Sequence, residues 1–100
     1  MNKPIIWVQS AFHERKTAAP GSANWKIYEG GGRHLQYVCP CGCGEWRNLP
    51  VKEGEKVKDC WYWDGNEIAP TITPSIQHVR HEPDDCNWHG YVTKGEWVTV

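Results

Sequence analysis

Apolar and polar residues alternate in short stretches along this chain, with the period of two that is typical of β-strands. The clearest case is residues 33–39, where Leu35, Tyr37 and Cys39 fall on one face and the even-numbered positions fall on the other. No stretch has a sustained helical period. The pattern therefore predicts a mostly β protein with little helix.

Turn-forming residues separate the expected strands and indicate how they are joined. Strands are predicted at residues 4–9, 25–28, 33–39, 45–51, 60–63, 88–93 and 96–100. Glycine-rich or Asp-Gly type turns lie at 30–32, 64–66 and 94–95, and such turns favour hairpins. Residues 11–16 fit either a helical turn or a continuation of the first strand. The expected architecture is a small antiparallel sheet built of β-hairpins.

Three segments interrupt this pattern. Residues 17–24, TAAPGSAN, are small and turn-forming and predict a loop, while the charged run 52–59 predicts a solvated loop or strand end. The stretch after Ile68 contains Pro70 and Pro74, each of which lacks an amide donor. The strand that contains them is therefore expected to lie at a sheet edge or to be broken.

The composition indicates that the hydrophobic core of so small a β protein needs additional stabilisation. The chain has 100 residues, enough for one domain over residues 1–100, and seven Trp and four Tyr carry much of the apolar surface. Small domains commonly add disulfides or a metal ion. The five cysteines are an odd number, and the apolar run Ile5–Val8 is too short for a signal peptide. We therefore expect a reduced, cytoplasmic protein that has free or metal-bound thiols and no membrane segment.

The cysteines and one histidine form the candidate metal site. Cys39, Cys41 and Cys43 lie in the turn sequence CPCGCG, and Cys86 and His89 lie in CNWHG. Structural zinc takes four Cys or His ligands, usually in pairs from two tight turns. The sequence predicts a zinc knuckle in which Cys86 and His89 supply one half. Three thiols compete for the other half, and the spacing does not decide between them.

Other potentially reactive residues are given structural interpretations. Cys60 adjoins Trp61 in an apolar run and is expected to be a core thiol. His78 and His81 have several charged neighbours, so an exposed polar loop is the favoured interpretation. No catalytic residue is predicted.

The motifs CPCGCG, PTITPSI and CNWHG together resemble those of an uncharacterised family of small phage and bacterial proteins with a CPCGCG…PSI…CxxH pattern. The resemblance covers residues 35–100. Cys39, Cys41, Cys43, Cys86 and His89 match its motif positions, as do Pro74, Ser75 and Ile76. It implies a zinc-binding β fold and a phage or prophage setting, with some bacterial relatives encoded near ubiquitin-conjugation-like genes. It implies no established activity.

Charge and aromatic content then suggest the function. The many aromatic residues favour a non-enzymatic module that binds or modulates another protein. The resemblance implies that this module is phage-encoded and that its partner is a host protein in the host cytoplasm. Single-stranded nucleic acid is an alternative partner, although a net charge of −1 weakens it. A zinc-dependent enzyme is the third alternative and ranks last, because four or five strong ligands suggest a filled coordination sphere.

Overall fold

The computed structural model describes residues 2–78 and 86–100. Its elements are one short helix and nine strands: β1 (Asn2–Pro4), β2 (Ile6–Trp7), α1 (Ala11–Glu14), β3 (Ser22–Ile27), β4 (Arg33–Val38), β5 (Trp46–Glu53), β6 (Trp61–Trp63), β7 (Ile72–Gln77), β8 (His89–Thr93) and β9 (Glu96–Thr99). The prediction of a mostly β fold is confirmed. No helix in the described part of the chain is long and apolar enough to cross a membrane.

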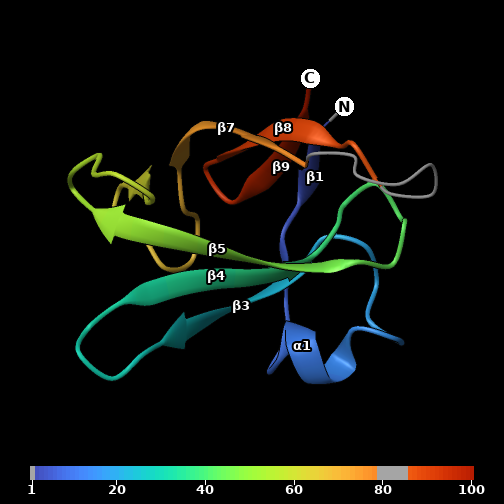
Figure 1. Ribbon diagram of the computed structural model, residues 1–100. Coiled ribbons are helices and arrows are strands. Elements are labelled where there is room, and N and C mark those ends of the chain that lie inside the picture. The colour runs from blue at the N-terminus through green and yellow to red at the C-terminus, as the bar shows by residue number, and fades with distance from the viewer. Residues whose placement is uncertain (1, 79–85) are drawn as a thin grey trace.

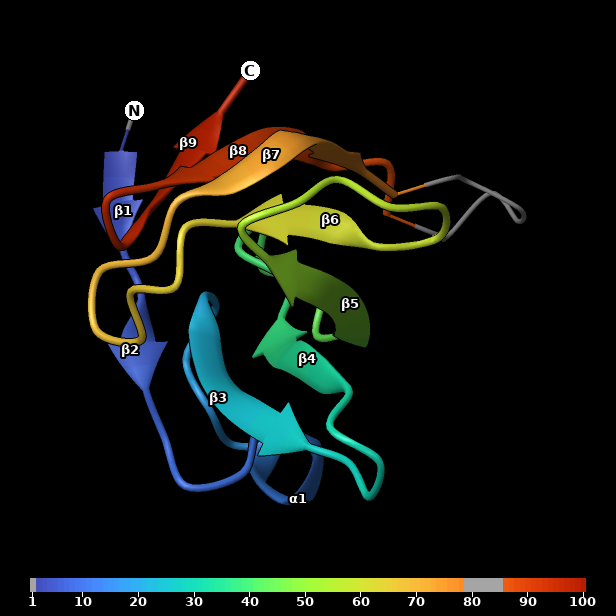
Figure 2. The same cartoon turned by 90° about the vertical axis from the view of Figure 1, so that its left-hand side faces the viewer.

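All nine strands belong to one strongly curved sheet (Figures 1 and 2). The strand order is β1-β9-β8-β7-β6-β5-β4-β3-β2. Most neighbours are antiparallel, but β2 pairs with β3, and β5 with β6, in parallel. The sheet is therefore not built of hairpins alone, because a parallel pair cannot be joined by a tight turn.

A single N-terminal segment almost closes the sheet. β1 pairs with β9 at one edge, while β2 pairs with β3 at the other. Between them, the Ile5 amide donates to the Gly95 carbonyl at 2.9 Å. In Figure 2 the two strands follow one another down the same side of the curved sheet.

The concave face of the sheet encloses an aromatic and aliphatic core. Trp97 is fully buried; its Nε1 donates to the Gly21 carbonyl at 2.9 Å, and its ring packs against Tyr37 and Trp88. Leu35, Ile72 and Val92 are also fully buried within this core. Large rings such as these suit a chain of this size, because it buries a limited fraction of its surface and each ring removes a large apolar area from water.

One open alternative is decided in favour of a helix, and two local expectations are corrected. Residues 11–14 form helix α1, capped where the Ser10 side chain accepts from the His13 amide. The loop expected at 17–24 ends earlier, because β3 already begins at Ser22. Cys60 is half-buried and lies outside the core.

The proline-containing strand β7 was expected to lie at a sheet edge or to be broken. It lies inside the sheet and is broken. Ile72 pairs with Val92 and Ile76 pairs with Gly90, so four residue steps along β7 match two along β8. Pro74 lies within this bulge, where its missing amide costs no ladder hydrogen bond. The bulge leaves the neighbouring Ser75 half-buried.

Gly90 is expected to be intolerant of any side chain. A Cβ atom there would lie 2.4 Å from Trp88 Cζ2 and 2.6 Å from the Val98 carbonyl oxygen. Gly90→Ala should therefore destabilise the fold by about 1–3 kcal/mol in urea unfolding, the usual effect of overpacking. Gly32→Ala is the matched control, since nothing lies within 4 Å of its Cβ position. Equal unfolding midpoints for the two variants would contradict this packing.

Candidate functional site

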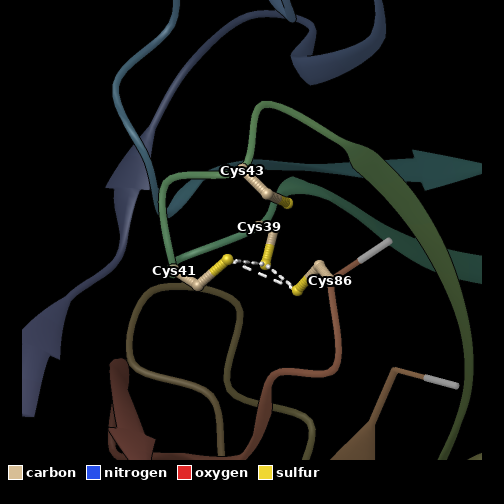
Figure 3. A group of neighbouring side chains, drawn as sticks. All are labelled: Cys39, Cys41, Cys43 and Cys86. Atoms are coloured by element: carbon tan, nitrogen blue, oxygen red, sulfur yellow. Dashed lines mark hydrogen bonds between the residues drawn. The ribbon is translucent and has the colours of Figure 1, made fainter. Parts of the chain in front are cut away.

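Four cysteine side chains come together where the loop between β4 and β5 meets the segment leading into β8 (Figure 3). The sulfur atoms of Cys39, Cys41, Cys43 and Cys86 all lie within 4.8 Å of one another. Those of Cys39, Cys41 and Cys86 form a triangle with sides of 3.3, 3.3 and 3.4 Å. All four cysteines are free thiols.

The loop sequence explains how three thiols from five positions point to one place. The Cys39 amide donates to the Glu45 carbonyl at 2.8 Å, which closes the base of the loop. Gly42 and Gly44 have φ values of 95° and 86°, which residues with a side chain rarely adopt. The two glycines therefore allow the tight loop that brings the three thiols of CPCGCG close to one another.

This donor set fits a metal ion. In a tetrahedral site with metal–sulfur bonds of about 2.3 Å, the sulfur atoms lie about 3.8 Å apart, close to the separations in the cluster. Burial raises the pKa of the Cys39 thiol well above its usual range. A bound metal would have to displace that proton, as zinc does at cysteine sites. The four cysteines could thus hold a metal ion, and no competition for two positions arises.

His89 does not belong to this group, which corrects the expected pairing of Cys86 with His89. Residues 86–90 alternate between buried and more exposed positions, with Cys86 and Trp88 buried, Asn87 exposed and His89 half-buried. Positions three apart in an extended chain face opposite sides. The CxxH spacing would join two ligands in a tight turn, but the chain here is extended and sends His89 to the other side.

On that side His89 meets Ser75. The His89 Nε2 lies 2.9 Å from the Ser75 Oγ, within hydrogen-bond distance. The two residues occupy neighbouring strands, because Gln77, two positions after Ser75, is the register partner of His89. Side chains in that diagonal relation share a face of the sheet. A serine hydroxyl bonded to an imidazole nitrogen is the geometry of an activated nucleophile.

Backbone contacts hold both members of the pair. The Trp61 indole donates to the Ser75 carbonyl at 3.3 Å. The Val100 amide donates to the His89 carbonyl at 3.0 Å. This pair was not predicted from the sequence, although Ser75 lies in the motif PSI and His89 lies in the motif CxxH. The one available sign of catalysis was that a serine and a histidine both occupy positions of these short motifs.

His78 is buried, which corrects the expectation that it lies in an exposed polar loop. Only 4% of its surface is exposed, and its ring stacks on Tyr37. Its Nδ1 faces the sulfur atoms of Cys39 and Cys86, while its Nε2 lies 2.7 Å from the Tyr37 hydroxyl. Burial, reinforced by the nearby charge of Arg47, lowers the pKa of His78 to about 4, so the ring is neutral near pH 7. His81 lies outside the described residues.

One of the comparisons with known proteins agrees with a nucleophilic site. The model of the family described as "Bacterial ubiquitination-like system serine protease (BubE)" matches residues 10–100, a wider range than 35–100. Neither the curated proteins nor the solved structures contain a match. The family's description overturns the expectation of a non-enzymatic interaction module and the low rank given to catalysis. The chain belongs to the BubE family of bacterial serine proteases.

Proposed function

We propose that this protein is a serine protease in which Ser75 is the nucleophile and His89 is the general base. The observation that carries the proposal is the 2.9 Å contact between the Ser75 Oγ and the His89 Nε2. A free serine hydroxyl is a weak nucleophile and needs an adjacent base. The family's description as serine proteases supports the same chemistry.

The other serines of the chain lack this environment. The sequence contains only two more, Ser10 and Ser22. The Ser10 Oγ accepts from the His13 amide as the cap of α1, and the buried Ser22 hydroxyl donates to the Ala19 carbonyl. Within the described residues, Ser75 alone has a histidine ring nitrogen as its hydrogen-bond partner.

The reaction follows from the positions of these two atoms. As the Ser75 Oγ attacks the substrate carbonyl carbon, its proton passes to the His89 Nε2. The same nitrogen then returns the proton to the departing amine, and the acyl group remains on Ser75 as an ester. Water, deprotonated by His89, hydrolyses this ester and restores the serine. Two easier steps thus replace one difficult one.

The four-cysteine cluster is proposed to hold a zinc ion with a structural role. Cys39, Cys41, Cys43 and Cys86 would fill all four positions of a tetrahedral site. A zinc ion in such a site supplies a cross-link between distant parts of the chain. The catalytic protons remain the task of Ser75 and His89, on the opposite side of the same strands.

We further propose that the substrate is a protein component of a ubiquitination-like system, the setting that the family's description gives. The site is compatible with a protein segment because both members of the pair are half-buried, not enclosed. They are thus reachable from outside the sheet.

A fluorophosphonate probe tests the catalytic pair without knowledge of the substrate, because it labels activated serines covalently. Peptide mapping by mass spectrometry should place the adduct on Ser75. His89→Ala should slow labelling by about 100-fold or more, the usual contribution of a general base. Ser10→Ala is the matched control and should label like the wild type. An adduct on another residue, or labelling unaffected by His89→Ala, would contradict the proposal.

A further inference from the structure

His78 makes contacts on both sides of its ring, and one side faces the thiol cluster. Its Nδ1 lies 3.7 Å from the Cys39 Sγ and 3.6 Å from the Cys86 Sγ. Its Nε2 lies 2.7 Å from the Tyr37 hydroxyl. A buried imidazole normally has hydrogen-bond partners, and the partners of His78 are the thiol cluster on one side and Tyr37 on the other.

One tautomer satisfies all of these contacts. Thiolates that bind a metal can only accept hydrogen bonds, so the Nδ1 would carry the proton and donate it toward Cys39 and Cys86. The Nε2 then accepts from the Tyr37 hydroxyl, which fixes the same tautomer. Although His78 approaches two of the sulfur atoms, it is not a member of the group of four donors that lie within 4.8 Å of one another. We therefore place it beside the four ligands, and the cobalt spectrum described below tests whether it binds the metal itself.

The contacts of His78 can offset the negative charge of a metal-bound thiolate cluster. Four thiolates and one divalent cation carry a net charge of 2−, which is costly where Cys39 and Cys86 are buried. The Trp88 amide donates to the Cys86 Sγ at 3.2 Å. An N–H donor from His78 would offset the same charge from the side of β7. Arg47, the register partner of Tyr37 in the β4–β5 ladder, is already paired with the Glu45 carboxylate at 2.7 Å, which leaves the N–H donors as the groups that offset the charge of the cluster.

The same residue is also tied to the strands that carry the catalytic pair. His78 follows β7 directly and its amide donates to the Trp88 carbonyl at 2.9 Å, next to His89. Along β7, the buried Ile76 and His78 alternate with the more exposed Ser75 and Gln77. His78 and Cys86 thus lie on the buried face, beside the thiol cluster. The segments that carry them continue into β7 and β8, whose opposite face holds Ser75 and His89.

We propose that His78 is a positioning residue whose Nδ1–H bonds to the thiolates of Cys39 and Cys86 stabilise the metal centre and thereby hold β7 and β8 in the alignment that Ser75 and His89 require. The link to catalysis rests on the proposed function. The link to the metal stands on the contacts of His78 alone.

Variants of His78 and Tyr37 test the hydrogen bonds. His78→Phe keeps a ring but has no donor, His78→Gln keeps an N–H donor, and Tyr37→Phe loses the hydroxyl that fixes the tautomer. Zinc affinity is measured by competition with a chromophoric chelator. His78→Phe should bind zinc about 10- to 100-fold more weakly, the usual effect of losing a group that supports metal ligands. His78→Gln should recover part of this loss, and Tyr37→Phe should lose less. His13→Ala, on α1, is the control.

Two further measurements separate positioning from other roles. The absorption spectrum of the cobalt(II) form should keep its four-thiolate signature in His78→Phe, with a shifted thiolate-to-metal band. With saturating zinc, kcat for an activated ester should fall while KM changes little. Unchanged zinc affinity in His78→Phe, or a cobalt spectrum showing the loss of a nitrogen ligand from the wild type, would overturn the proposal. If Ser75→Ala retained full activity, the proposed function would fail, whereas the zinc affinities would still decide the role of His78.

Discussion

Replacing Ser75 by Ala should lower kcat for the hydrolysis of an activated ester such as p-nitrophenyl acetate by about 10⁴-fold or more, the effect of removing a nucleophile from a serine protease. The reason is that the attacking oxygen itself is lost. Because Ser75 is only half-buried and lies in a bulge, its removal should leave the melting temperature and the metal content unchanged. Stopped-flow kinetics should also show the loss of the initial burst that reports the acyl-enzyme.

Comparison with His89→Ala sharpens this test. Because the two residues act as a unit, the double variant should be no slower than the worse of the single variants, a non-additivity that independent sites would not give. Ser22→Ala is unsuitable as a control since Ser22 is buried, so Ser10→Ala serves instead. Full activity in Ser75→Ala would exclude Ser75 as the nucleophile.

Removal of the metal should unfold the protein. Structural zinc contributes an apparent binding free energy of about 10–16 kcal/mol, whereas small domains are stable by only about 5–15 kcal/mol. Treatment with a strong chelator should therefore abolish the cooperative thermal transition, and zinc should restore it. Cys86→Ser should have the same effect, because Cys86 alone links the segment before β8 to the loop between β4 and β5 within the cluster.

Cys60→Ser is the matched control for the metal. Cys60 is a free thiol outside the cluster, so its variant should retain one zinc ion per chain by native mass spectrometry and an unchanged melting temperature. A chelated protein that melts cooperatively at the original temperature would rule out a structural role for the cluster. Since Cys86→Ser could also fail to express, the chelator titration of the wild type carries the test.

The strands were largely predictable from sequence, whereas their arrangement was not. Alternation in residues 33–39 and the turn at 94–95 specify β4 and the β8–β9 hairpin locally. The parallel pairing of β5 with β6 and the near-closure by β1 and β2 depend on contacts between distant segments. No local pattern encodes such pairings, because they are set by packing of the whole core.

The site was predictable to a similar extent. Cys39, Cys41, Cys43, Cys86 and His89 were predicted to form the metal centre, and the four cysteines do lie together. The prediction was wrong for His89. In a tight turn the spacing CxxH brings both side chains to one point, whereas in an extended chain it places them on opposite faces. The Ser75–His89 contact depends on the pairing of β7 with β8, two strands that are separated in the sequence, and no local pattern specifies that pairing.

The N-terminal segment has a consequence for self-association. β1 and β2 occupy the two edges of the sheet, and they are separated in sequence by Ile5 alone. Exposed edges are templates for pairing between molecules. Detachment of this one segment would expose the edges of β9 and β3 together. Each molecule would then have two unpaired strand edges, through which several molecules could associate into an open-ended oligomer. The same few residues thus cover the edges of β9 and β3 at both ends of the sheet.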